Sequence, residues 1–63
     1  MNKQNRQEMK DWINMKLKFI NAIIKEAQLS HNYGKEIQYA GMREAYLEFL
    51  QKVNSEHFGE AAA

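Results

Sequence analysis

The sequence contains no cysteine, which excludes disulfide bonds and thiolate metal sites. Its two histidines, His31 and His57, are too far apart in sequence to form a local pair of metal ligands. A chain of 63 residues forms one domain at most, and a domain near this size buries only about 60% of the surface that its unfolded chain exposes. Small folds of this kind usually gain stability from disulfides, a metal or a partner chain. Association with another chain is therefore the expected source of additional stability.

Proline is absent as well, and only three glycines interrupt a chain rich in Lys, Glu, Gln, Met, Leu and Ala, which are good helix formers. This composition predicts an all-α fold. The longest apolar runs are far shorter than the ~20 residues that span a bilayer, and the polar N-terminal segment does not resemble a signal peptide. We therefore expect a cytoplasmic protein with no membrane partner, and we interpret the alanines at 61–63 as a cloning remnant.

The first predicted helix covers residues 5–29. Asn5 is a favourable N-cap, and Glu8 is placed to complete a capping box with it. Trp12 and Phe19 lie beyond the edge of the apolar stripe of this helix, so the apolar arc is wider than one facing helix can cover. The stripe itself consists of Met9, Ile13, Leu17, Ile20, Ile23, Ile24 and Ala27.

The second predicted helix covers residues 33–57, with Gly59 as its C-terminal stop. Residues 30–31 are assigned to the turn and Asn32 to the N-cap, while Gly34 offers an alternative boundary as the residue that ends the first helix. The apolar stripe of the second helix follows the a/d spacing of helical bundles and consists of Tyr39, Met42, Tyr46, Phe49, Leu50 and Val53.

Two amphipathic helices joined by a short turn form an antiparallel hairpin, here a single domain of residues 1–60. A hairpin leaves much of its apolar surface in water, and large exposed apolar patches are normally interfaces. We therefore expect it to form a homodimer, as a four-helix bundle, or a higher oligomer, and to bind another protein. Residues 3–29 carry a net charge of +3 and residues 33–60 a net charge of −2, which favours pairing specificity more than stability.

The candidate interface consists of residues that belong to the two apolar stripes or border them. Trp12 is interpreted either as a hot spot for a partner or as part of the core of a self-assembled bundle. Lys16 and Arg43 lie at the margins of the apolar arcs. They either contact an acidic partner or, in the favoured interpretation, lay their stems over aromatic rings with the charge turned outward or paired across an oligomer interface. The full set is Trp12, Lys16, Phe19, Ile23, Tyr39, Gly41, Met42, Arg43, Tyr46, Phe49 and Val53.

Gly41 is an unexpected residue within a strongly helical segment. Glycine costs a helix about 1 kcal/mol relative to alanine, and Gly41 lies opposite Leu50 on the helical wheel, away from the main stripe. We predict that another helix backbone or a partner approaches Gly41 so closely that a Cβ would clash.

A basic side of the first helix, chiefly Lys10, Lys18 and Lys25, is the candidate surface for RNA or DNA. The tyrosines able to stack on bases lie instead on the acidic second helix, and the net charge of +1 is low, so core packing is their favoured role. No Ser/His/Asp set, catalytic carboxylate pair or phosphate-binding glycine loop is visible, and neither a cofactor nor a metal is expected. The sequence therefore predicts a protein that is not an enzyme.

A short pattern in residues 32–50 resembles helical hairpins encoded by bacteriophages and mobile elements of Gram-positive bacteria; it consists of Asn32-Tyr33, Tyr39-Ala40-Gly41-Met42, Ala45-Tyr46 and Leu50. The resemblance implies a small accessory protein that acts by binding, such as an inhibitor, adaptor or regulator. In its length, its MNKQ start and its Phe58-Gly59 pair, the chain also resembles the Rop family of plasmid copy-number proteins. That resemblance implies the alternative function, an RNA-binding dimer of helical hairpins.

Overall fold

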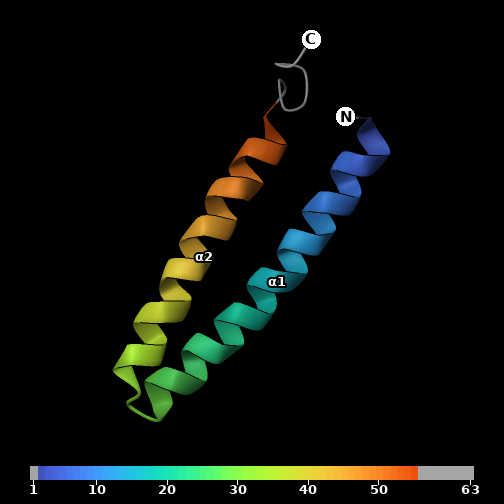
Figure 1. Ribbon diagram of the computed structural model, residues 1–63. Helices are drawn as coiled ribbons and strands as arrows, with labels where there is room; N and C mark the ends of the chain where they lie inside the picture. The colour runs from blue at the N-terminus through green and yellow to red at the C-terminus, as the bar shows by residue number, and fades with distance from the viewer. Residues whose placement is uncertain (1, 56–63) are drawn as a thin grey trace.

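The computed structural model describes residues 2–55, which form two α-helices joined by a short turn (Figure 1). Helix α1 spans Lys3–Leu29 and helix α2 spans Tyr33–Asn54. The helices run antiparallel, so the start of α1 and the end of α2 lie at the same end of the molecule (Figure 1). The prediction of an all-α hairpin is thus confirmed. Within the described residues, no helix is both long enough and apolar enough to cross a membrane.

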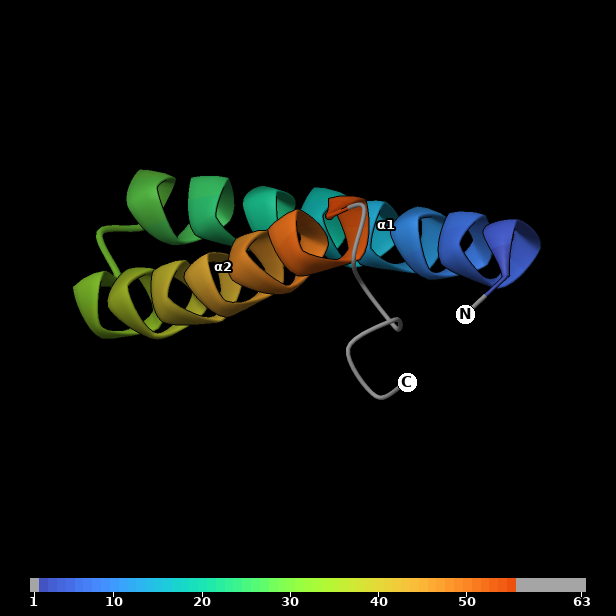
Figure 2. The ribbon, with the colours of Figure 1, turned by 90° about the horizontal axis from the view of Figure 1, so that it is seen from above.

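The two helices form one layer rather than an enclosed bundle. The molecule is long and thin, with principal extents of 47 × 18 × 11 Å. Seen from a second direction, α2 lies against α1 along most of its length (Figure 2). Because a layer of two helices has two open broad faces, apolar side chains on those faces stay in contact with water.

Helix α1 begins earlier than predicted, and its N-cap is Asn2 rather than Asn5. The side-chain Oδ1 of Asn2 accepts a hydrogen bond from the backbone N–H of Asn5 at 2.8 Å. The N–H of Arg6 donates to the Asn2 carbonyl at 3.1 Å. Both asparagines are suitable caps, and capping at Asn2 extends the helix by three residues, just under one turn. The predicted capping box between Asn5 and Glu8 is therefore wrong.

The C-terminus of α1 closes in a Schellman motif. Ser30 is the C-cap, and His31 adopts a left-handed backbone conformation with a φ of 58°. The N–H of His31 donates to the carbonyl of Gln28 at 3.2 Å, and the N–H of Asn32 donates to the carbonyl of Ala27 at 2.8 Å. This motif usually places glycine at the left-handed position, which His31 occupies here. The assignment of residues 30–31 to the turn is confirmed.

Helix α2 begins at the predicted cap. The Oδ1 of Asn32 accepts a hydrogen bond from the backbone N–H of Lys35 at 3.2 Å, which confirms Asn32 as the N-cap. Gly34 lies inside the first turn of α2, so the alternative boundary at that residue is wrong. The two helices are thus connected by a C-cap followed almost immediately by an N-cap.

The end of α2 comes earlier than predicted. Ser55 has an extended backbone conformation, with φ −66° and ψ 138°, and α2 therefore stops at Asn54. The prediction of helix through residue 57 is wrong at Ser55. The remainder of that extension, and the expected stop at Gly59, lie outside the described residues.

Most of the hydrophobic core comes from α1. Its buried side chains repeat at intervals of four, three, four and three residues, so they line one side of the helix, as predicted; they are Ile13, Leu17, Ile20, Ile24 and Ala27. Among the described residues of α2, only Val53 is buried. It packs with Ile13 and Leu17, against which the half-buried Met9, Tyr46 and Leu50 also lie. The stripe predicted for α2 therefore stays partly in water.

Candidate interaction face

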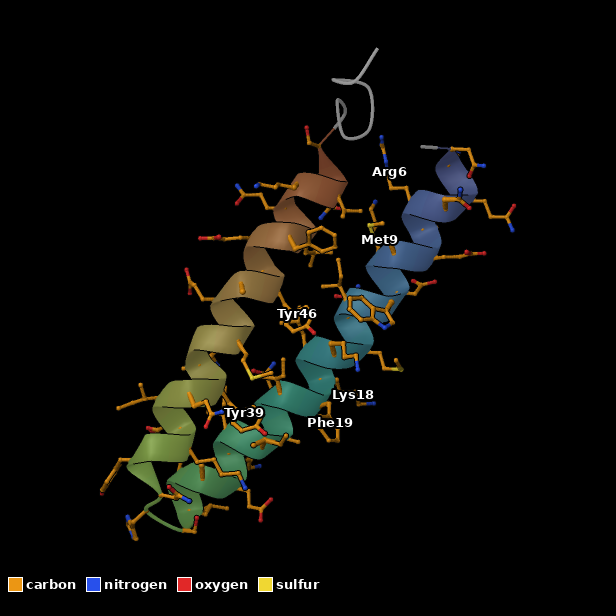
Figure 3. All side chains as sticks on the ribbon, viewed as in Figure 1. Arg6, Met9, Lys18, Phe19, Tyr39 and Tyr46 are labelled. Carbon is orange, nitrogen blue, oxygen red and sulfur yellow. The ribbon has the colours of Figure 1, made fainter. Side chains whose placement is uncertain are left out.

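An aromatic pocket opens between the two helices. The rings of Trp12 on α1 and Tyr46 on α2 are tilted by 59°, with their centroids 5.8 Å apart. Together with Ala45 and Phe49 they line an open depression of about 330 Å³. Figure 3 shows Tyr46 extending from α2 toward α1. Tilted aromatic pairs at this separation are favourable, so the pocket is held in place by contacts within the chain.

The apolar surface continues beyond the pocket along both helices. Phe19 follows Trp12 by seven residues and Met42 precedes Phe49 by seven, so each lies on the pocket side of its helix. The exposed fractions are 67% for Phe19, 45% for Trp12, 39% for Met42 and 38% for Phe49. This surface is termed the aromatic face, and it consists of Trp12, Phe19, Ile23, Met42, Ala45, Tyr46 and Phe49.

The aromatic face is predominantly apolar. Its side chains offer apolar area, which gains about 25 cal/mol per Å² on leaving water. The lining of the pocket is almost wholly apolar, so a partner would be held there chiefly by burial of apolar area. Six residues of the predicted interface therefore lie on this face. Ala45, which was not among the predicted residues, also lines the pocket. Its position four residues before Phe49 is the signal that would have found it.

Lys16 lies beside the pocket and contacts its tryptophan. The ammonium Nζ is 5.6 Å from the centroid of the Trp12 ring, which is cation–π geometry. The Lys16 side chain is half-buried. The favoured interpretation placed the stem of this lysine over an aromatic ring with the charge turned outward; the structure does bring Lys16 to such a ring, but it is the ammonium that lies over it.

Arg43 links the two helices. Its Nη1 donates a hydrogen bond to the side-chain Oδ1 of Asn21 at 3.3 Å, and the arginine is half-buried. Asn21 lies about 160° from Phe19 around α1, so this contact is on the broad face opposite the aromatic face. Arg43 therefore has a partner within its own chain. Asn21 is not among the predicted residues, because nothing in the periodicity of one helix indicates which residue of the other lies opposite.

Two further members of the predicted interface lie between the helices. Val53 has an exposed fraction of 0%, so in the hairpin it has no surface to offer a partner. Tyr39 is half-buried and extends from α2 toward α1 (Figure 3). Both residues stabilise the hairpin itself, because each contributes apolar area to the contact between α1 and α2.

Gly41 is exposed, and a Cβ built there would meet no atom within 4 Å. The predicted approach of another helix backbone is therefore wrong within the described chain. The approach of a partner at Gly41 stays a prediction.

The lysines predicted to contact nucleic acid lie away from the aromatic face. Lys18 and Lys25 are exposed and seven residues apart, so they share one side of α1, while Lys10 is half-buried. Lys18 lies about 100° from Phe19 around the helix. The structure thus separates the basic side of α1 from the aromatic face.

The histidine in the turn contacts a neighbouring tyrosine. The His31 and Tyr33 rings have centroids 6.2 Å apart, and the tyrosine hydroxyl is 3.4 Å from His31 Nδ1. Residues 2–55 contain no group of three or more His, Cys, Asp or Glu side chains placed to hold a metal ion. His57 lies outside the described residues.

Comparisons of this chain with protein families, with curated proteins and with solved structures find no match. The function is therefore argued from the surfaces of the hairpin alone.

Proposed function

We propose that this chain is a small protein-binding accessory factor, such as an inhibitor, adaptor or regulator, that acts as a self-associated helical bundle and not by catalysis. The observation that carries the proposal is the aromatic face, where four large side chains are each more than one-third exposed. Large apolar side chains gathered on one open face are normally covered by another protein surface. Tryptophan and other aromatic residues are enriched among those that dominate binding energy.

The self-association is tested by analytical ultracentrifugation over a wide concentration range. We expect a reversible dimer or higher oligomer, which Phe19→Lys shifts toward monomer because a charge then has to be desolvated in the interface. Ile37→Lys is the matched control. Ile37 is 72% exposed, similar to Phe19, but it lies about 140° from Met42 around α2 and so off the aromatic face. A monomer at all concentrations, or equal effects of the two variants, would contradict the proposal.

The accessory role is tested by affinity capture with the same two variants. A protein that is retained by the wild-type chain and by Ile37→Lys, but lost with Phe19→Lys, is the expected result. The resemblance of residues 32–50 to hairpins of phages and mobile elements supports bacterial lysates as the source for this experiment. A captured protein that binds all three chains equally would count against a role for the aromatic face.

A second candidate function is RNA or DNA binding by a hairpin dimer. It is supported by the exposed pair Lys18 and Lys25, which lies outside the aromatic face and would stay accessible if that face were covered. Electrophoretic retardation at low salt tests it, since phosphate contacts weaken steeply as salt rises. We expect the double variant Lys18→Glu/Lys25→Glu to abolish any retardation, whereas Phe19→Lys should not. Absence of retardation by the wild-type chain at low salt would rule this candidate out.

A further inference from the structure

The aromatic face has charged side chains at both of its ends. At the open end of the hairpin, Glu8 lies one turn before Trp12 and Lys52 lies about one turn after Phe49. Because Trp12 and Phe49 line the same pocket, the carboxylate and the ammonium flank that pocket from the two helices. Both Glu8 and Lys52 are exposed.

At the turn end, the same arrangement recurs. Glu26 follows Ile23 by three residues on α1, and Lys35 precedes Met42 by seven on α2, so both lie on the aromatic side of their helices. Both are within one turn of the connection between the helices, and both are exposed. Along the rim of the face, α1 therefore supplies acids and α2 supplies bases.

Two copies of such a face can stack about a two-fold axis in two ways. With the turns at the same end, α1 of each copy lies over α2 of the other, so Glu8 meets Lys52 and Glu26 meets Lys35. With the turns at opposite ends, each helix lies over its own counterpart, so Glu8 meets Glu26 and Lys52 meets Lys35. Charges that are segregated by helix therefore favour the first arrangement and oppose the second.

Lys16 adds to the same preference. It lies between Trp12 and Phe19 near the middle of the face, with its ammonium over the Trp12 ring. With turns at opposite ends, the Lys16 side chains of the two copies would be brought toward each other across the axis. With turns at the same end, each faces α2 of the other copy near Ala45, a small and uncharged residue that leaves room for the lysine.

We propose that the aromatic face binds a second copy of this chain with the two turns at the same end, in a register selected by the acidic rim of α1 and the basic rim of α2. This rests on the self-association in the proposed function and adds the orientation of the copies. In the dimer with turns at opposite ends, like charges would lie directly opposite each other and disfavour that arrangement. The charge pattern therefore selects one orientation of the two copies.

The orientation is tested by measuring the distance between the two turns in solution. The sequence has no cysteine, so Ser30→Cys gives one site for a spin label per copy. Turns at the same end offset the two labelled residues by one helix-packing distance within a layer and one between the layers, which together separate them by roughly 13 Å. Turns at opposite ends separate them by roughly 40 Å, the length of the 27-residue helix α1.

A single charge reversal gives an independent readout. Glu26→Lys is expected to weaken the dimer about two- to tenfold, because it places a base opposite Lys35. In the opposite-end arrangement the same change would strengthen the dimer, because it would place a base opposite Glu8. Glu44→Lys is the matched control, since it changes the net charge equally and lies about 140° from Phe49 around α2.

The outcomes separate this inference from the proposed function. The shorter label distance together with a weaker Glu26→Lys dimer supports the inference. A dimer with labels roughly 40 Å apart, or one that Glu26→Lys strengthens, overturns the orientation and leaves self-association intact. A wild-type chain that stays monomeric overturns both. The charge reversal is measured without the cysteine, so a misfolded Ser30→Cys variant, detected by circular dichroism, leaves the second readout decisive.

Discussion

Helices α1 and α2 carry apolar stripes of similar size, yet they use them differently. Helix α1 buries five side chains against its neighbour, whereas only Val53 is buried on the described part of α2. The stripe of α1 is centred on the direction of α2, so nearly all of it is covered. The stripe of α2 is turned so that Val53, Tyr46 and Leu50 face α1 while Met42 and Phe49 face outward. A two-helix hairpin can therefore bury nearly all of the apolar stripe of one helix while part of the other stripe stays exposed. This is why the aromatic face lies partly on α2.

The largest expected effect tests this contrast with the same substitution in both helices. Ile13→Ala, at a site with 0% exposure on α1, is expected to cost about 2–5 kcal/mol of unfolding free energy because it leaves a cavity. Ile37→Ala, at a site 72% exposed on α2, should stay within about 0.5 kcal/mol. Urea or thermal denaturation followed by circular dichroism measures both. Similar losses of unfolding free energy at the two sites would show that α1 and α2 do not differ in how much of their apolar surface is buried.

The turn that joins the helices offers a stabilising change. His31→Gly is expected to raise stability by about 1 kcal/mol, since glycine adopts the left-handed conformation of residue 31 without steric cost. The gain is reduced by the loss of the contact between the His31 and Tyr33 rings. His31→Ala is the control, because it removes the same ring and keeps the backbone penalty. Thermal unfolding should rank glycine above histidine and alanine; alanine as stable as glycine would refute the explanation.

Gly41 tests whether the outer side of α2 is open or covered. In the isolated hairpin Gly41→Ala should raise stability by up to about 1 kcal/mol, because the added Cβ meets no atom within 4 Å. If a partner approaches there, the same change weakens self-association. Unfolding of the dilute monomer and sedimentation of the concentrated protein measure the two effects separately. A more stable hairpin with unchanged association would end the prediction of a close approach at Gly41.

The smallest expected effect concerns the contact between the helices on the opposite broad face. A double-mutant cycle of Asn21→Ala and Arg43→Ala is expected to give a coupling of about 0.5 kcal/mol, as is common for an exposed hydrogen bond. The single changes should leave self-association unaltered, because the pair is remote from the aromatic face. Sedimentation of each single variant checks this, and a loss of self-association would place Arg43 at an interface after all.

The predictions that the structure confirms are those for which one helix alone carries the signal. The stripe of α1 and the cap at Asn32 follow from local spacing and local hydrogen bonding, and both are present in the structure. The start of α1 was misplaced because Asn2 and Asn5 are equally good caps, and the longer helix makes more hydrogen bonds. The Schellman motif that ends α1 could not be predicted, because its left-handed position is occupied by His31 and not by the usual glycine. These errors are local and come from ambiguous or atypical capping residues.

Three properties of the described residues 2–55 can be read from the sequence alone: the helical fold, the turn near residue 31, and the side of α1 that is buried. Those properties follow from composition and from periodicity within one helix. The tertiary structure decided how far α2 is rotated about its own axis, and thereby that Tyr46 meets Trp12, that Arg43 meets Asn21, and that Phe49 is left partly in water. The physical reason is that this rotation depends on the packing of both helices together, and spacing within one helix carries no information about it.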